Sequence, residues 1–324
     1  MPTNTLITPS VVKVAEDVAD QIYNFNPSDA PLMSMIGRRS IDNVYFEWQR
    51  DTYRTPDATR AAIEGADATY AAQTEPTLLN NRTQIFQDTV SVSNTAERVK
   101  KYGRDSEAKR LKMKKMIELK RDQEAACIAS GATVTGSDVA AGKLRGLYGF
   151  ITNDRLAAAG SPASPDPTTN TAPTAGTAED FDESDLKAGI QSCYTNGGDG
   201  SVVMCSPSHK VRISGFTGSV QRTNEVGGRQ AAVLNAAFDF YRSDFGVTKI
   251  VPNRIMAGSA AGLKSTVYII DADKIELAVL RGFETEQMAT VGDAKNWQVR
   301  TEVSLWVGDE KPLYAIRDCT DSGA

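Results

Sequence analysis

Histidine and paired cysteines are almost absent from this chain of 324 residues. His209 is the only histidine, and no two of the four cysteines (Cys127, Cys193, Cys205 and Cys319) form a Cys-x-x-Cys pair. Most zinc sites need several such ligands, so the sequence argues against a zinc centre. Without a pairing pattern, the cysteines are expected to be free, reduced thiols of a protein made in the cytoplasm.

Long apolar runs are missing as well. No stretch approaches the roughly 18 apolar residues that a transmembrane helix needs. Residues 1–25 have no continuous apolar segment and carry Glu16, Asp17 and Asp20, so no secretory signal is expected there.

The chain also lacks an excess of positive charge. It has 36 basic and 41 acidic residues, whereas a dedicated nucleic-acid-binding protein is usually basic. With 40% hydrophobic residues it is too apolar to be disordered throughout. Its length suggests two or three domains.

Catalytic patterns fail at specific positions. The Gly-rich stretch 136–144 departs in spacing from a phosphate-binding loop, and Leu144 stands where that loop needs a hydroxyl. Ser184 and Lys187 match a Ser-x-x-Lys pattern, but its partner motifs are absent. No Gly-x-Ser-x-Gly nucleophile accompanies His209. We therefore predict no catalytic residue, no cofactor and no metal site.

Residues 43–94 are predicted to form a long two-stranded hairpin. The aromatic segment 44–49 is the outgoing strand, and 83–92, with Phe86 on its apolar face, is the returning strand. The stretch 55–81 between them is polar and poor in core-forming residues. Such a hairpin cannot bury itself, so a neighbouring subunit is its simplest partner.

The strongest local pattern is a charged helix at 97–130. It contains no proline, and its one glycine, Gly103, lies near its start. Gly131 follows directly and predicts the end of the helix. At 1.5 Å per residue the helix would be roughly 50 Å long. Its basic residues outnumber its acidic ones, in a chain that is acidic overall.

The second half of the chain divides into three regions. An apolar, strand-like segment at 147–151 precedes the low-complexity stretch 157–178, which we expect to be an exposed loop. Residues 181–256 alternate helical and strand patterns and predict an α/β domain. Residues 264–318 predict a long antiparallel sheet.

Three local motifs and the order of these parts point to one family. The motifs are Asn26-Pro27 with Ala30-Pro31-Leu32 and Phe46-Glu47-Trp48-Gln49, then Asn196-Gly197-Gly198, and finally Trp297-Gln298-Val299 with Glu302-Val303-Ser304-Leu305. They are similar to the opening, the axial-domain entry and the closing strands of a phage major capsid family. The whole arrangement resembles the Hong Kong 97 capsid fold of tailed bacteriophages, from which the Pro-rich stretch 160–175 departs.

The resemblance implies an α+β fold with five parts. These are an N-terminal arm at 1–42, an extended loop at 43–94, a spine helix with the start of a peripheral domain at 95–180, an axial domain at 181–262 and peripheral-domain strands at 263–324. It implies a major capsid protein, not an enzyme, that assembles in the host cytoplasm into the virion. Pentamers and hexamers would form the icosahedral head around double-stranded DNA.

Two alternatives remain open at this point. An encapsulin-type bacterial compartment shares the fold and packages enzymes. A hydrolase or small-molecule-binding protein with an α/β domain belongs to another class and would need a convergent polar site.

The resemblance also implies partners and contact residues. The partners are further copies of the chain and scaffold, portal and decoration proteins, with packaged DNA touched only through non-specific proximity and no membrane. The candidate subunit-interface residues are Phe46, Trp48, Phe86, Arg104, Arg110, Gly227 and Gly228. The aromatic residues would anchor the loop on a neighbour, although filling their own subunit's core explains them equally well. The two glycines would lie near the centre of a capsomer.

Overall fold

The computed structural model describes most of the chain. The described residues are 29–65, 67, 70, 72–101, 105–216, 240–258, 262–290 and 292–320. The spacing of the apolar residues in 9–22 predicts a helix there, but that segment and the candidates Arg104, Gly227 and Gly228 lie outside the described residues.

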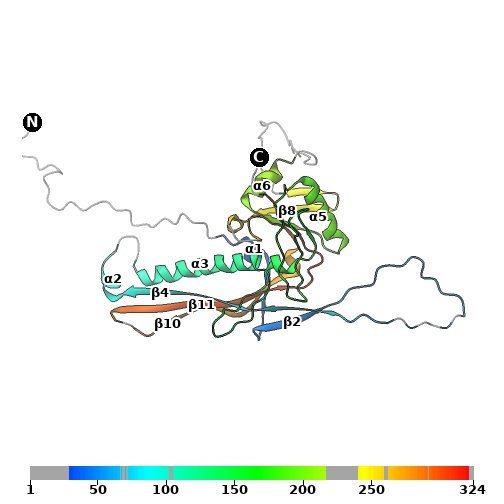
Figure 1. Cartoon of the computed structure of the whole chain (residues 1–324). Coiled ribbons are helices and arrows are strands. Elements are labelled where there is room, and N and C mark those ends of the chain that lie inside the picture. The colour runs from blue at the N-terminus through cyan, green and yellow to red at the C-terminus, as the bar shows by residue number, and fades with distance from the viewer. Residues whose placement is uncertain are drawn as a thin grey trace, which may run out of the picture.

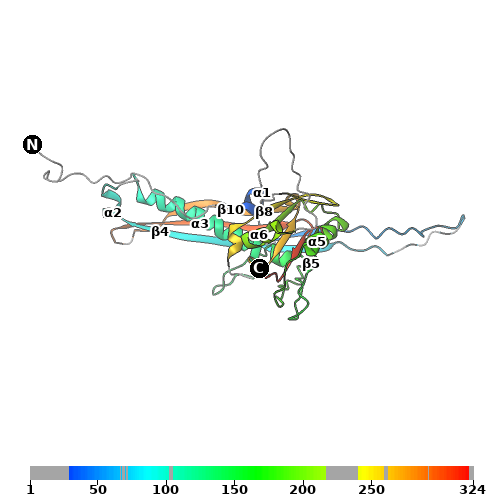
Figure 2. The ribbon, with the colours of Figure 1, turned by 90° about the horizontal axis from the view of Figure 1, so that it is seen from above.

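The described chain forms an elongated molecule with a compact centre. The spine helix α3 (Glu107–Ala129) lies along a long sheet on one side, and a second, mixed domain sits above the end of that helix (Figure 1). Residues 51–76 form a narrow loop that leaves the centre in the direction opposite to the start of α3, as both ribbon views show (Figure 2). The molecule therefore has two projections that point away from each other.

The long sheet has four strands in the order β1-β10-β11-β4. Strands β10 (Ile275–Gln287), β11 (Ala294–Val307) and β4 (Gln84–Ser93) are antiparallel, and β1 (Gly37–Ser40) adds a parallel edge. Along β4, buried and open positions alternate, and Phe86 is buried as its strand pattern predicts. One face of the sheet is thereby available for packing against α3.

The second sheet is mixed and has six strands. Its order is β5 (Asp154–Arg155), β12 (Tyr314–Ile316), β9 (Val267–Ile270), β6 (Val202–Cys205), β8 (Gly246–Pro252) and β7 (Phe240–Ser243). The expectation of one long antiparallel sheet over 264–318 was wrong, because β9 and β12 belong to this second sheet. Every residue of β6, β9 and β12 is buried, as is typical of strands covered on both faces.

The extended loop starts from a smaller hairpin than the sequence suggested. Strand β2 (Tyr45–Arg50) pairs with β3 (Thr77–Arg82), with Arg50 opposite Thr77. The predicted returning strand at 83–92 is instead β4 of the long sheet. Val90 and Val92 on the buried face of β4 pack with Ala108 and Leu111 near the start of α3, and this burial sets the register of the strand.

The predicted helix at 97–130 is interrupted. A short helix, α2 (Asn94–Arg98), ends at Val99, whose backbone is extended, and α3 begins only after Ser106. The Glu97 carboxylate caps α3 by accepting hydrogen bonds from the Ser106 hydroxyl (2.6 Å) and the Glu107 amide (3.0 Å). These contacts favour a new helix start over continuation of α2.

Two helices of the second domain begin at capping residues that can be recognised in the sequence. Helix α5 (Glu183–Thr195) begins in a capping box formed by Asp182 and Asp185. Helix α6 (Pro207–Ser214) has Ser206 as its N-cap and a proline in its first turn. The strand expected at 147–151 was wrong, because α4 (Leu147–Phe150) is a short helix that is buried throughout.

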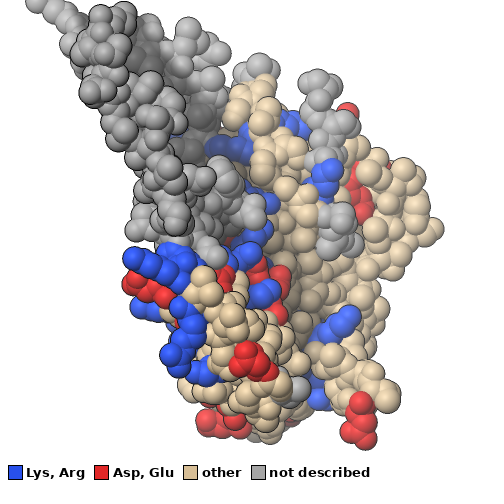
Figure 3. All heavy atoms as spheres, turned by 90° about the vertical axis from the view of Figure 1, so that its left-hand side faces the viewer, with Lys and Arg blue, Asp and Glu red and all other residues tan. Residues whose placement is uncertain are grey.

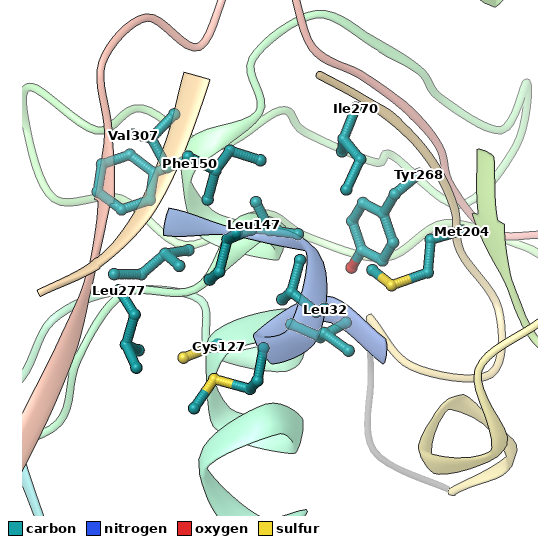
Figure 4. Packing of buried hydrophobic residues seen from close by; sticks show 14 of the residues in the cluster. Leu32, Cys127, Leu147, Phe150, Met204, Tyr268, Ile270, Leu277 and Val307 are labelled. Carbon is teal, nitrogen blue, oxygen red and sulfur yellow. The ribbon is translucent and has the colours of Figure 1, made fainter. Parts of the chain in front are cut away.

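One apolar cluster joins the two sheets to the helices. Leu32 of α1 (Pro31–Met35) lies at its centre, with Cys127 and Leu147 on one side and Met204 and Tyr268 on the other (Figure 4). The short 3-10 helix η2 (Arg254–Ala257) contributes Met256 to the same cluster, and η3 (Ala272–Lys274) leads into β10. The arm end, the spine helix and both sheets therefore share one core.

Candidate assembly surfaces

The base of the extended loop is held by an aromatic cluster of its own subunit. The Trp48 ring stacks on Phe46 at 5.6 Å between centroids and contacts Trp306 at 5.9 Å and Phe150 at 6.0 Å. The Arg39 guanidinium lies 4.0 Å from the Trp306 ring centre. Trp48 is partly buried against the main core, so its packing fixes where the loop leaves the subunit.

An ion pair also holds the base of the extended loop. Arg50, the last residue of β2, bonds to the buried carboxylate of Glu310 and lies 3.8 Å from Asp309. The Arg50 and Glu310 side chains are 13% and 3% exposed, so solvent screens this pair little. The loop therefore starts from a point that is fixed by charge as well as by packing.

The returning strand β3 is fixed by Asn81 and Arg145. The Asn81 side chain accepts from the Arg145 amide (2.8 Å) and donates to the carbonyls of Arg145 (3.0 Å) and Leu305 (2.6 Å). The Arg145 guanidinium in turn donates to the Pro167 carbonyl (2.9 Å) and to Oδ1 of Asn170 (2.7 Å). Burial lowers the pKa of Arg145 to about 10, and these acceptors keep its charge solvated by protein groups.

Beyond this fixed base, the loop itself has almost no contact with its own subunit. Tyr53, Ile63 and Tyr70 are each at least 81% exposed. Five acidic residues and two basic ones accompany them in 51–76. Tyrosine is one of the residue types that contribute most to binding at protein interfaces, so the two exposed tyrosines are the best candidates for contact with another molecule. These residues were not among the predicted interface residues, because their only signal in the sequence is their isolation in a polar stretch.

The spine helix presents different faces to the sheet and to the outside. Lys115 bonds to Asp88 of β4 (2.9 Å), and Lys112 lies over the Trp297 ring of β11. Met113 and Ile117, on the other side, are 58% and 43% exposed. Figure 3 looks at the end of the molecule that carries α2 and the start of α3, where Lys and Arg side chains gather with Asp and Glu between them.

A buried carboxylate joins three segments near the other end of α3. Glu124 accepts hydrogen bonds from the backbone amides of Leu32 (2.8 Å) and Met33 (2.9 Å) and from the Asn253 side chain (2.7 Å). Its pKa is raised because burial penalises the charged form, an effect that these donors partly oppose. This carboxylate thus ties the arm end and the chain after β8 to the spine helix.

Among the groups considered for chemistry, the histidine and the cysteines are used in packing, whereas Ser184 and Lys187 are exposed. His209 is buried, with Nδ1 2.9 Å from the Ser206 hydroxyl and Nε2 3.2 Å from the Thr320 carbonyl. All four cysteines are buried and free, and burial raises their pKa values. Ser184 lies in the first turn of α5.

No group of potential metal ligands occurs within the described residues. No helix among them has the length and apolarity to cross a bilayer.

The structure gives different outcomes for the interface candidates. Phe46 and Trp48 lie together at the loop base, whereas Phe86 is buried under α3 in the main core. Arg110 lies on α3 and pairs with Glu107 in its own helix. Contact of these residues with a second subunit stays a prediction.

Comparisons with known proteins agree with one another. A family model described as the SU10 major capsid protein matches residues 1–320. The major capsid protein of Escherichia phage Phieco32 is 28% identical over 322 residues, covering 89% of each chain. The cyanophage A-1(L) capsid structure aligns with a TM-score of 0.66 at 12% identity, over 97% of this chain and 98% of that one. The SrpI encapsulin of Synechococcus elongatus aligns at 0.54 with 9% identity, over 96% and 94%.

Proposed function

Because the chain belongs to the SU10 major capsid protein family, we propose that pentamers and hexamers of it build an icosahedral head shell around phage DNA. It is a virion component with the Hong Kong 97-type fold, as the order of its parts predicted. The family model matches nearly the whole chain, which favours the phage shell over the encapsulin alternative. The hydrolase alternative has less support, because the histidine is held in the interior between Ser206 and Thr320.

The extended loop carries the assembly part of this proposal. Its base is held by Trp48, Arg50 and Asn81, while Tyr53 and Tyr70 stand free of the subunit that holds them. A loop that is fixed at its base and carries exposed aromatic residues is preorganised to bind another surface. We propose that this surface belongs to a neighbouring copy of the chain.

Replacement of the loop tests this role. Since Arg50 lies opposite Thr77, replacing residues 51–76 by Asn-Gly closes β2 and β3 with a two-residue hairpin turn. We expect a folded subunit with an unchanged denaturation midpoint but few closed shells by negative-stain microscopy. Val139→Ala, which truncates an apolar residue that is 98% exposed outside the loop, is the matched control. Normal shells from the shortened chain would contradict the proposal.

A second contact is proposed around the capsomer axis. Strand β7 is the edge of the six-stranded sheet, and Phe240 and Val247 on the β7-β8 hairpin are 63% and 61% exposed. Nearby, the rings of Tyr194 and Phe245 lie 5.1 Å apart and are both largely exposed. An open edge strand with exposed apolar neighbours suits contact with the next copy in a ring.

The remaining partners follow from the role of a shell subunit. We propose transient binding of a scaffold protein, contact with a portal and with decoration proteins, and non-specific proximity to the packaged DNA. The net charge of −5 supports loose contact with DNA, since a strongly basic inner surface would hold it tightly. We also propose that the chain has no catalytic activity of its own, in keeping with a structural family.

A further inference from the structure

The outer face of α3 is apolar in its middle and basic around that middle. Met113 and Ile117 are one helical turn apart, and both are open to solvent. Lys109 and Lys114 are also exposed, and Arg121 is half-buried. Across Glu107–Ala129 there are seven basic residues against four acidic ones, so this face attracts an acidic segment with apolar side chains.

The C-terminal part of the same face is already covered by this chain's own arm. Glu124 lies two helical turns beyond Ile117, and it binds the first turn of α1 through the Leu32 and Met33 amides. Leu32 and Met33 belong to the same core cluster as Ile128 of α3. An arm contact on α3 therefore exists two helical turns C-terminal to the exposed apolar pair.

The chain that precedes α1 has the complementary composition. Residues 11–22 contain Val11, Val14, Val18 and Ile22 at helical spacing, together with one lysine and three acidic residues. The ten residue steps from Ile22 to Leu32 reach up to about 33 Å when extended. The distance from Glu124 back to Met113 along the helix is only about 16 Å, so the segment reaches the exposed face of its own subunit.

We propose that residues 11–22 of the arm dock on the outer face of α3 in the same chain, with their valines on Met113 and Ile117. The acidic residues Glu16, Asp17 and Asp20 then lie among Lys109, Lys114 and Arg121. The long basic side chains extend past the apolar pair to reach these carboxylates. Docking extends the contact of α1 into a continuous arm interface along the spine helix.

A designed disulfide tests the position. The variant Val18→Cys with Ile117→Cys places one cysteine in each partner, and the four native cysteines are buried and do not compete. In the full-length chain, mild oxidation is expected to link them within one chain, seen by peptide mass. The matched control is Val18→Cys with Ser91→Cys, whose second cysteine lies at an exposed position of β4. We expect on the order of tenfold more linkage in the first pair.

A charge exchange tests the electrostatic part. In the Val18→Cys, Ile117→Cys background, Arg121→Glu is expected to lower the linkage about two- to threefold, and adding Asp17→Lys is expected to restore it. Lys295→Glu, on β11, is the control and is expected to leave the linkage unchanged. Equal linkage in both cysteine pairs, linkage only between different chains, or an additive loss in the double charge variant would overturn the proposal. Since the linkage is read within a subunit, its result is separate from that of shell formation.

Discussion

The side-chain amide of Asn253 donates a hydrogen bond of 2.7 Å to Glu124, a carboxylate that is fully buried in the spine helix. The same carboxylate accepts from two backbone amides of α1. None of its hydrogen-bond donors is a charged group, so the carboxylate joins three chain segments without an ion pair.

Removal of the Glu124 side chain is expected to destabilise the subunit. Glu124→Ala leaves buried donors of Leu32, Met33 and Asn253 without their acceptor, which costs about 2–4 kcal/mol of unfolding free energy. Glu118→Ala is the matched control, because Glu118 pairs only with neighbouring lysines at the surface of α3 and its loss costs at most about 1 kcal/mol. Urea unfolding of both variants measures the difference, and equal losses would refute the role of the junction.

The raised pKa of Glu124 predicts a pH dependence of known sign. The folded state binds this proton more tightly than the unfolded state, whose pKa is near 4.5. The Glu124 contribution to the unfolding free energy is therefore fully present below about pH 4.5 and is lost as the pH rises through the raised folded pKa. Glu124→Gln should remove that decline, as measured by urea unfolding from pH 4.5 to about pH 7.

Two other carboxyl groups act in a separate pH window. The pKa values of Asp88 and Asp166 are lowered, chiefly by hydrogen bonds from Lys115 and Thr168. Their stabilisation is lost only as the pH falls below about 3.8. They therefore do not contribute to the pH dependence of the unfolding free energy above pH 4.5. An identical slope in wild type and Glu124→Gln above pH 4.5 would contradict the assignment.

Trp48 is expected to stabilise the isolated subunit, whereas Tyr53 is expected to stabilise the shell. Its ring packs on Phe150 and Trp306, so Trp48→Ala should lower the unfolding free energy by about 2–4 kcal/mol. Tyr53→Ala, in contrast, should leave the isolated subunit unchanged and weaken shells, because Tyr53 has no cover in its own chain. Subunit unfolding compared with shell disassembly in denaturant separates the two effects. A Tyr53 variant that unfolds early, or shells that resist its change, would argue against this division.

Asn81 is expected to matter more than the asparagine beside it. Asn81→Ala removes three hydrogen bonds to backbone groups of Arg145 and Leu305 and leaves those groups buried, at about 2–4 kcal/mol. Asn80→Ala is the control, since Asn80 contacts Arg145 through its backbone carbonyl. Thermal unfolding of the two variants tests the ranking, and a similar loss from Asn80→Ala would contradict it.

Local signals in the sequence were sufficient where the neighbouring residues decide the structure. The helical patterns expected within 181–256 correspond to α5 and α6, which begin at the capping acids Asp182 and Asp185 and at Ser206-Pro207. The spine helix was predicted too long, because its start depends on the Glu97 side chain folding back across a break. Periodicity alone does not reveal such a contact.

Pairing partners were the part that the sequence did not disclose. The apolar runs of β9 and β12 were recognised as strands, but only tertiary contacts assign them to the six-stranded sheet. Among the site residues, Phe46 and Trp48 were chosen for their aromatic character, which serves core and interface alike. Tyr53 and Tyr70 were overlooked because an exposed aromatic residue carries no periodic pattern.

The two opposite projections of the molecule have a mechanical consequence in a closed shell. The loop and the sheet tip both extend past the core of the subunit, so in a shell we expect them to touch copies that the core does not meet. A force applied to one subunit is then expected to be shared by subunits beyond those that border it. Loss of a single subunit from such a lattice loosens a wider ring of copies than those that border the gap.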